Sequence, residues 1–246
     1  MDQITLCGVL IHDLTREQAL AEALRERPAP CVVVTPNALM LERCRRTPHY
    51  AALLNRATLS LPDGSGVLRA ARRCGTPLRE RIPGIEFGEA LLQAAAERGD
   101  RIFLLGGAPG VAARAAQRLI QRYPGLAICG THHGYFAKEG EENRRVIEVV
   151  QRAAPEILFV CFGFPLQEEW MEQNLEQLPS LRLAAGLGGS LDVWAGDLRR
   201  APSFLGNLGL EWAWRMLWEP KRWKQFPLLL RFALHSGKVL QDEPQR

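Results

Sequence analysis

Asp63 is a carboxylate at the end of a short apolar stretch, and this residue type accepts a proton in general base catalysis. Residues 57–61 alternate leucines with smaller residues, as a half-buried strand does, and Pro62 and Gly64 then form a turn. Open α/β sheets bind their ligands at the carboxyl ends of parallel strands, so Asp63 is a candidate catalytic residue. An Asp-Gly pair also forms ordinary turns without any ligand, and that alternative stays open for this stretch.

Four other predicted strand ends carry residues that suit a polar ligand. Glycines there let backbone N–H groups and the positive end of a helix approach an anion closely. Each of these segments also has a purely structural explanation, as a tight turn, a helix cap or an acidic first helical turn. Their convergence on one edge would indicate a large polar ligand that bears phosphates. The residues are Thr35 and Asn37, Gly106 and Gly107, Gln167 and Glu168, and Gly188, Gly189 and Asp192.

The order of the predicted elements indicates the fold class. Apolar strands alternate with helical segments of about 10–15 residues, which predicts an α/β protein with a mostly parallel, Rossmann-like sheet and helices on both faces. One core domain is expected over 1–202, with a helical appendage over 203–246. The predicted strands are 31–34, 57–61, 101–105, 126–129, 156–162 and 181–187, with a strand or small hairpin at 3–13, and a single helix is predicted over 38–54.

Composition limits the classes of partner and the compartment. The chain has 246 residues and a net charge of +4, a mild excess that does not indicate a nucleic acid partner. Its six cysteines show no Cys-x-x-Cys spacing, which is typical of a reducing compartment. No stretch approaches the about 20 apolar residues that span a bilayer, and the N-terminus lacks the pattern of a secretory signal. A cytoplasmic protein is therefore expected.

The last part of the chain has a different character. Residues 208–220 form an amphipathic pattern with three tryptophans, and 221–231 mix lysine and arginine with apolar residues. Such segments lie in the headgroup region of anionic membranes, which predicts peripheral attachment to the inner face of the cell membrane. The alternatives are that this tail packs on the core or on a neighbouring subunit. In the second case the protein would be a homo-oligomer.

No metal site or cofactor is predicted. His132 and His133 are adjacent and lack the spacing or the carboxylates of a metal motif. The chain also has no Asp-x-Asp sequence, which many glycosyltransferases use to hold a divalent cation, and no Gly-x-Gly-x-x-Gly turn, which disfavours a dinucleotide oxidoreductase.

A set of short motifs, in the same order along nearly the whole chain, resembles the WecG/TagA/CpsF family of bacterial glycosyltransferases. Each motif alone is weak, whereas the ordered set is specific. The motifs are Thr35-x-Asn37, Pro62-Asp63-Gly64, Arg81-Ile82-x-Gly84, Leu104-Leu105-Gly106-Gly107, Gly134-Tyr135-Phe136, Gly163-x-Pro165-x-Gln167-Glu168, Gly186-x-Gly188-Gly189 with Asp192, Arg200-Ala201-Pro202, Gly209-Leu210-Glu211-Trp212-x-x-Arg215 and Glu219-Pro220-x-Arg222.

The resemblance implies transfer of a sugar, such as N-acetylmannosamine or its uronic acid, from a UDP-sugar to a saccharide on undecaprenyl diphosphate during surface polysaccharide assembly. It further implies inversion at the anomeric carbon without a metal. By the family pattern Asp63 is the general base, Thr35 and Asn37 line the substrate pocket, and Gln167 lies near the nucleotide. A non-catalytic protein that binds a sugar nucleotide at the membrane is the alternative, and it would not need Asp63.

The departing UDP must be stabilised, and without a metal we expect helix N-termini and arginines to do so. Arginine suits this role because its planar guanidinium can pair with two phosphate oxygens. One departure from the family stands at Leu166, where relatives commonly have lysine, so a cationic contact is missing there. The further expected substrate contacts are Gly64, Arg81, Gly84, Arg200, Arg215 and Arg222.

Overall fold

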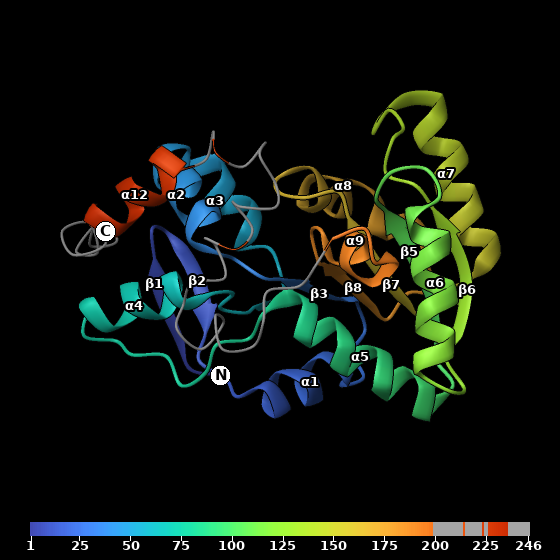
Figure 1. The fold of residues 1–246 in the computed structure, drawn as a ribbon, viewed down its shortest axis with the longest axis horizontal. Helices are drawn as coiled ribbons and strands as arrows, with labels where there is room; N and C mark the ends of the chain where they lie inside the picture. Colours follow the sequence, from blue (N-terminus) through green and yellow to red (C-terminus); the bar gives the residue numbers. More distant parts are fainter. Residues whose placement is uncertain (199–213, 215–222, 224–225, 236–246) are drawn as a thin grey trace. The chain divides into compact units, whose positions relative to one another are not determined.

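The computed structural model describes residues 1–198, Trp214, Trp223 and 226–235 (Figure 1). The chain divides into two compact units. The first contains residues 1–19, 35–83 and the described residues after 200, and the second contains residues 20–34 and 84–199. The predicted boundary between core and appendage at residue 202 lies outside the described residues and stays a prediction.

The second unit is built on a parallel sheet. Its strands β5 and β7 consist almost wholly of buried apolar residues, as expected of strands covered on both faces. Every pair of neighbouring strands runs parallel. In spatial order the strands are β3 (Cys31–Val34), β8 (Leu183–Gly186), β7 (Ile157–Cys161), β5 (Arg101–Gly106) and β6 (Ala127–His132).

Helices cover both faces of this sheet. The connections from β5 to β6 and from β6 to β7 cross the sheet in opposite directions, so right-handed crossovers place α6 and α7 on opposite faces. Figure 1 shows α6 and α9 packed together in front of the strands. The helices are α5 (Gly84–Arg98), α6 (Val111–Arg122), α7 (Gly140–Ala153), α8 (Leu166–Asn174) with a 3-10 turn (Leu175–Gln177), and α9 (Ser190–Ala195).

Specific contacts fix these helices in pairs. Helix α5 passes α9 at Gly88, where an added Cβ would lie 3.0 Å from the Trp194 ring. On the other face α7 joins α8, because the Trp170 indole donates to the Asn143 side-chain oxygen at 2.7 Å, and the Asn143 amide donates to Asn174 at 2.9 Å. The predicted α/β class with helices on both faces of a mostly parallel sheet is thus confirmed.

The first unit is smaller in its regular structure. An antiparallel hairpin of β1 (Gln3–Leu6) and β2 (Val9–His12) confirms the predicted strand pair at 3–13. Helix α12 (Phe226–His235) packs against α2, with Phe232 buried, and the Arg73 guanidinium donates to the Ala233 carbonyl at 2.8 Å. No described helix is both long and apolar enough to cross a membrane. The remaining elements are α2 (Ala38–Arg46), α3 (Pro48–Leu54), β4 (Leu59–Ser60) and α4 (Ser65–Arg73), and α1 (Arg16–Leu24) spans the boundary between the units.

Three predicted elements differ from those observed. The single helix predicted over 38–54 is two helices, because Pro48 lacks an N–H and occupies the first position of α3. The strand predicted over 57–61 is only two residues long, ending before Pro62. The strand predicted over 126–129 continues as β6 to His132, since its pairing with β5 extends to that residue.

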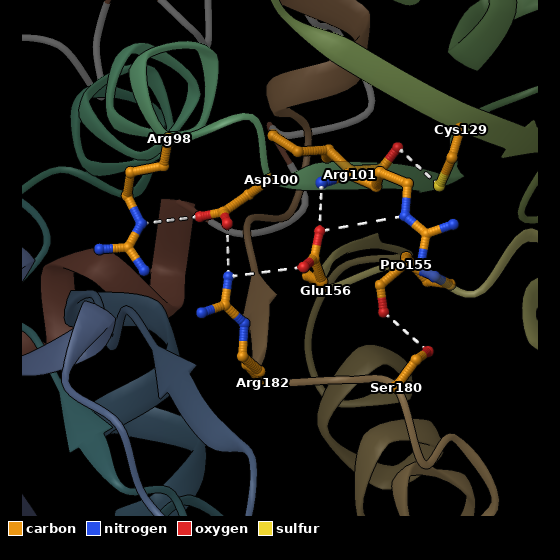
Figure 2. Close-up of polar contacts among 9 residues, drawn as sticks. Arg98, Asp100, Arg101, Cys129, Pro155, Glu156, Ser180 and Arg182 are labelled. Carbon is orange, nitrogen blue, oxygen red and sulfur yellow. Dashed lines mark hydrogen bonds and ion pairs between the residues drawn. The ribbon is translucent and has the colours of Figure 1, made fainter.

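A network of charged side chains joins the amino ends of the strands in the second unit (Figure 2). The Asp100 carboxylate, which is buried, accepts a hydrogen bond from Arg98 Nε at 3.0 Å and another from Arg182. Glu156 accepts from the Arg101 backbone N–H at 2.8 Å and lies 3.9 Å from Arg182. The network ties the end of α5 to the starts of β5, β7 and β8.

Replacing Asp100 by alanine should lower the free energy of unfolding by about 1–3 kcal/mol, because Arg98 and Arg182 lose a buried acceptor. The loss is moderate because both guanidiniums are 42% exposed and regain hydration. Urea denaturation measures it. Glu148→Ala, at an exposed position on α7, is the control and should change the value by less than about 0.5 kcal/mol. Equal effects of the two substitutions would contradict a structural role for the network.

Candidate active site

The second unit contains an open pocket of about 830 Å³ at the carboxyl edge of its sheet. This is the edge at which open α/β sheets bind ligands, and the volume suits a small-molecule site. Four strand exits contribute to it. The lining residues are Gly107 and Ala108 after β5, 134–138 after β6, Cys161–Gly163 after β7, Gly188 and Gly189 after β8, and the helical residues Glu142, Leu166 and Asp192.

Of the predicted contacts in this unit, Gly107, Gly188, Gly189 and Asp192 line the pocket, and Gly106, Gln167 and Glu168 do not. Gly106 has a structural reason to be glycine. Its φ is +147°, and an added Cβ would lie 2.4 Å from the Cys161 carbonyl oxygen. The close approach of β5 to β7 therefore requires glycine at this position whether or not a ligand is bound.

Gln167 is buried and joins two of the loops that form the pocket. Its side-chain oxygen accepts hydrogen bonds from the Gly163 N–H at 3.2 Å and from the Gly188 N–H at 3.0 Å. The first loop follows β7 and the second follows β8. Gln167 thus acts on the pocket through the backbone that it holds, and its predicted place near the nucleotide stays a prediction.

Glu168, the next residue, is buried with an incomplete set of hydrogen bonds. Its Oε1 accepts from the Gln167 side-chain amide at 2.9 Å, and its Oε2 has no partner among the described residues. Burial raises the pKa of this carboxyl to about 7, because an ionised carboxylate is costly in an apolar environment. Glu168 fixes the orientation of the Gln167 amide, since its oxygen can accept only from the NH₂ end.

The loop after β6 brings aromatic and cationic groups to the pocket. Tyr135 is 73% exposed, and the Lys138 ammonium donates to the Gly134 carbonyl at 2.6 Å and to the Phe136 carbonyl at 2.9 Å. The same ammonium lies 3.7 Å from the Phe136 ring centroid and 4.3 Å from that of Phe162. Burial lowers the pKa of Lys138 from its ordinary value. The sequence pattern gave no reason to select Lys138, because it is a single lysine outside the motifs.

Leu166, the position at which the resemblance implies a lysine, is 49% exposed and lines this same pocket. An apolar side chain therefore occupies a part of the wall where the resemblance implied a cation.

In the first unit, backbone hydrogen bonds hold Asp63 between two other segments with predicted site residues. The Asp63 N–H donates to the Pro36 carbonyl at 3.0 Å, and the Ile82 N–H donates to the Pro62 carbonyl at 2.9 Å. These bonds bring the segments of Thr35, Asn37, Asp63, Gly64 and Arg81 together. Asp63 itself is half-buried.

Local turn chemistry accounts for part of this arrangement. The Asn37 side-chain oxygen caps α2 by accepting from the N–H groups of Leu39 at 3.0 Å and Met40 at 3.2 Å. Gly64 has φ +93° immediately before α4, a conformation that favours glycine, so this glycine has a local structural reason whether or not a ligand binds. Upstream, the Ser60 N–H donates to His12 Nδ1 at 3.1 Å, which holds the strand that leads to Asp63.

The remaining predicted contacts are placed in part. Gly84 is buried at the start of α5, whereas Arg200, Arg215 and Arg222 lie outside the described residues. Within the part of the chain that the structure describes, no group of three or more His, Cys, Asp and Glu side chains is arranged to hold a metal ion.

The chain is similar to proteins of one family. The model of the WecG/TagA/CpsF glycosyl transferase family matches residues 4–244. An N-acetylglucosaminyldiphosphoundecaprenol N-acetyl-beta-D-mannosaminyltransferase from Bacillus spizizenii is 35% identical over 211 residues, which cover 86% of this chain and 79% of that protein. A protein of the same name from Staphylococcus aureus strain MRSA252 is 37% identical over 207 residues, covering 84% and 78% respectively.

Glu168→Gln should stabilise the protein relative to wild type, and the stabilisation should be larger at pH 8 than at pH 4. The pKa of Glu168 is raised from 4.5 to about 7, so its proton stabilises the folded state fully below pH 4.5, and this stability is lost as the pH rises through 7. Glutamine at this position stays neutral and can still accept from Gln167. The gain over wild type should therefore grow by about 3 kcal/mol between pH 4 and pH 8.

Urea denaturation across this pH range tests the prediction, with Glu176→Gln at an exposed position as the control. Parallel stability profiles for wild type and Glu168→Gln would show that the Glu168 carboxyl does not titrate with a raised pKa.

Proposed function

Because the chain belongs to the WecG/TagA/CpsF family of glycosyltransferases, we propose that it transfers an N-acetylmannosamine-type sugar from a UDP-sugar to a saccharide on undecaprenyl diphosphate. The observation that carries the proposal is the likeness, over most of the chain, to two enzymes whose names contain this sugar and this lipid-linked N-acetylglucosamine acceptor. The biological role that follows is assembly of a surface polysaccharide.

The pocket of the second unit supports a nucleotide-sugar donor. It opens at the strand exits, where Gly107, Gly188 and Gly189, which have no side chains, let a ligand approach the backbone closely. Helix α6 begins shortly after Gly107, and its positive end favours a phosphate group. Tyr135 offers an exposed aromatic face in the same wall, on which a base can stack. The pocket therefore combines the groups that a UDP moiety requires.

Asp63 is the proposed general base. In a direct displacement the acceptor hydroxyl oxygen attacks the anomeric carbon as the bond to UDP breaks, and this displacement inverts the configuration. Asp63 takes the hydroxyl proton. The backbone bonds to Pro36 and around Pro62 support this role, because they hold the main chain of Asp63 in a fixed position. Thr35, Asn37 and Arg81 are the proposed substrate contacts in the adjoining segments.

The departing UDP is proposed to be stabilised without a metal. Developing negative charge on the diphosphate would be met by helix N-termini and by arginines, which pair with two phosphate oxygens at once. The proposed arginines are Arg81, Arg215 and Arg222, and the last two lie outside the described residues.

Attachment to the membrane is proposed to be peripheral. The lipid-linked acceptor requires access to the membrane surface, and large apolar side chains are exposed on and just before α12: Trp223 (61%), Phe226 (41%) and Leu230 (49%). The lysines and arginines of this part of the sequence suit an anionic leaflet. The expected place is the cytoplasmic face of the cell membrane.

Asp63→Asn should lower turnover by about 10²- to 10⁴-fold, the usual contribution of a general base, and leave UDP binding unchanged. The assay measures UDP release from UDP-N-acetylmannosamine in the presence of a short-chain polyprenyl-diphosphate N-acetylglucosamine. Asp2→Asn, an exposed position in the same unit, is the matched control and should retain full activity. Full activity of Asp63→Asn would remove this residue from the mechanism, and wild-type UDP binding without turnover would favour a non-catalytic scaffold.

Turnover should be unchanged in EDTA and should not rise when magnesium is added, because arginines and helix dipoles replace the cation. The same UDP-release assay measures this after dialysis against the chelator. Loss of activity in EDTA that magnesium restores would refute metal independence and leave the assignment of donor and acceptor standing.

A further inference from the structure

The pocket of the second unit has an unusual balance of charge for an anion site. Its described lining includes two carboxylates, Glu142 and Asp192, and one cationic side chain, Lys138. Glu142 has a structural task, because its Oε2 accepts from the Ala137 backbone N–H at 2.7 Å. Any phosphate that enters this pocket therefore meets a single side-chain cation on the described walls.

Lys138 is held in place by hydrogen bonds and ring contacts with neutral groups. Two carbonyl oxygens, of Gly134 and Phe136, accept two of its three N–H bonds, and the Phe136 and Phe162 rings pack against the ammonium. No described carboxylate oxygen lies within the 4.0 Å of an ion pair with it. Carbonyls and rings are neutral, so the positive charge persists, and one N–H bond remains for a ligand.

The position of this ammonium relative to the glycine turn is fixed by hydrogen bonds. Lys138 donates to the Gly134 carbonyl, and the Gly134 N–H donates to the Gly107 carbonyl at 2.8 Å. Gly107 opens the turn that leads into α6, and an added Cβ there would lie 2.8 Å from Val111. Gly134 therefore connects the ammonium, through one hydrogen bond on each side, to Gly107, whose backbone is suited to approach a phosphate.

We infer that Lys138 donates a charge-assisted hydrogen bond to the diphosphate of the donor nucleotide in this pocket, an inference that rests on the proposed function. Partial burial strengthens the interaction, because the desolvated ammonium, with its lowered pKa, gains more from an anion than an ammonium in water does. Lys138 is thus a binding residue for the donor. It supplies from the loop after β6 a cation that the wall at Leu166 does not provide.

The test compares UDP with uridine, which has the same base and sugar but no phosphate. Lys138→Met removes the ammonium group and its charge but keeps an unbranched side chain that is only one atom shorter. NMR titrations should show about 10- to 100-fold weaker UDP binding and an unchanged uridine affinity, the loss expected for a hydrogen bond between charged groups. Arg152→Met, which removes one exposed charge from α7, should change neither affinity.

Equal weakening of UDP and uridine, or no weakening of either, would overturn the inference, because Lys138 would then only support the loop or play no part. Absence of UDP binding by the wild-type protein would instead overturn the proposed function. If Lys138→Met fails to fold, Lys138→Gln replaces it, since glutamine can still donate to a backbone carbonyl. The same selective loss of UDP affinity is expected for that variant.

Discussion

The candidate donor pocket depends on one buried amide group, the side chain of Gln167. Its single oxygen accepts two backbone N–H groups from loops that follow different strands of the sheet, at Gly163 and Gly188. Glycine loops have many accessible conformations, and one fixed acceptor shared by both loops restricts them to one shape. The amide can serve both loops only in one orientation, and Glu168 selects it by accepting from the opposite end. The shape of the pocket is therefore determined by buried residues that do not line it.

The charged side chains differ between the two edges of this sheet. At the amino edge, Asp100 and Glu156 are matched by arginines, so charge is neutralised locally and the network stabilises the fold. At the carboxyl edge, Lys138 contacts carbonyls and rings, and burial raises the pKa of Glu168 to about 7, so this carboxyl is only partly ionised near neutral pH. A positive charge that is hydrogen-bonded to carbonyl groups, with no described carboxylate at ion-pair distance, favours an incoming anion. The proposed placement of the nucleotide diphosphate follows from this difference.

The first unit serves a different requirement, the exact position of one carboxylate. Asp63 lies in a loop whose backbone is hydrogen-bonded to Pro36 on one side and to Ile82, through Pro62, on the other. Gly64 releases the chain into α4 with a positive φ, and His12 holds the strand before the loop. A local structural role for the Asp-Gly pair and the proposed base are thus compatible, because the backbone bonds fix the Asp63 main chain whatever its side chain contacts. The two interpretations weighed from sequence do not exclude one another.

The sequence alone determined the fold class, the order of strands and helices and the glycine turns, because apolar periodicity and turn chemistry act within a few residues. It misjudged element ends where Pro48 and the β5–β6 pairing intervened. Only the tertiary structure decided that Gln167 reaches Gly188, 21 residues away, that Glu168 is buried with an elevated pKa, and that Lys138 faces the pocket. Those properties arise from burial and from partners distant in the chain, and local sequence patterns carry no information about either.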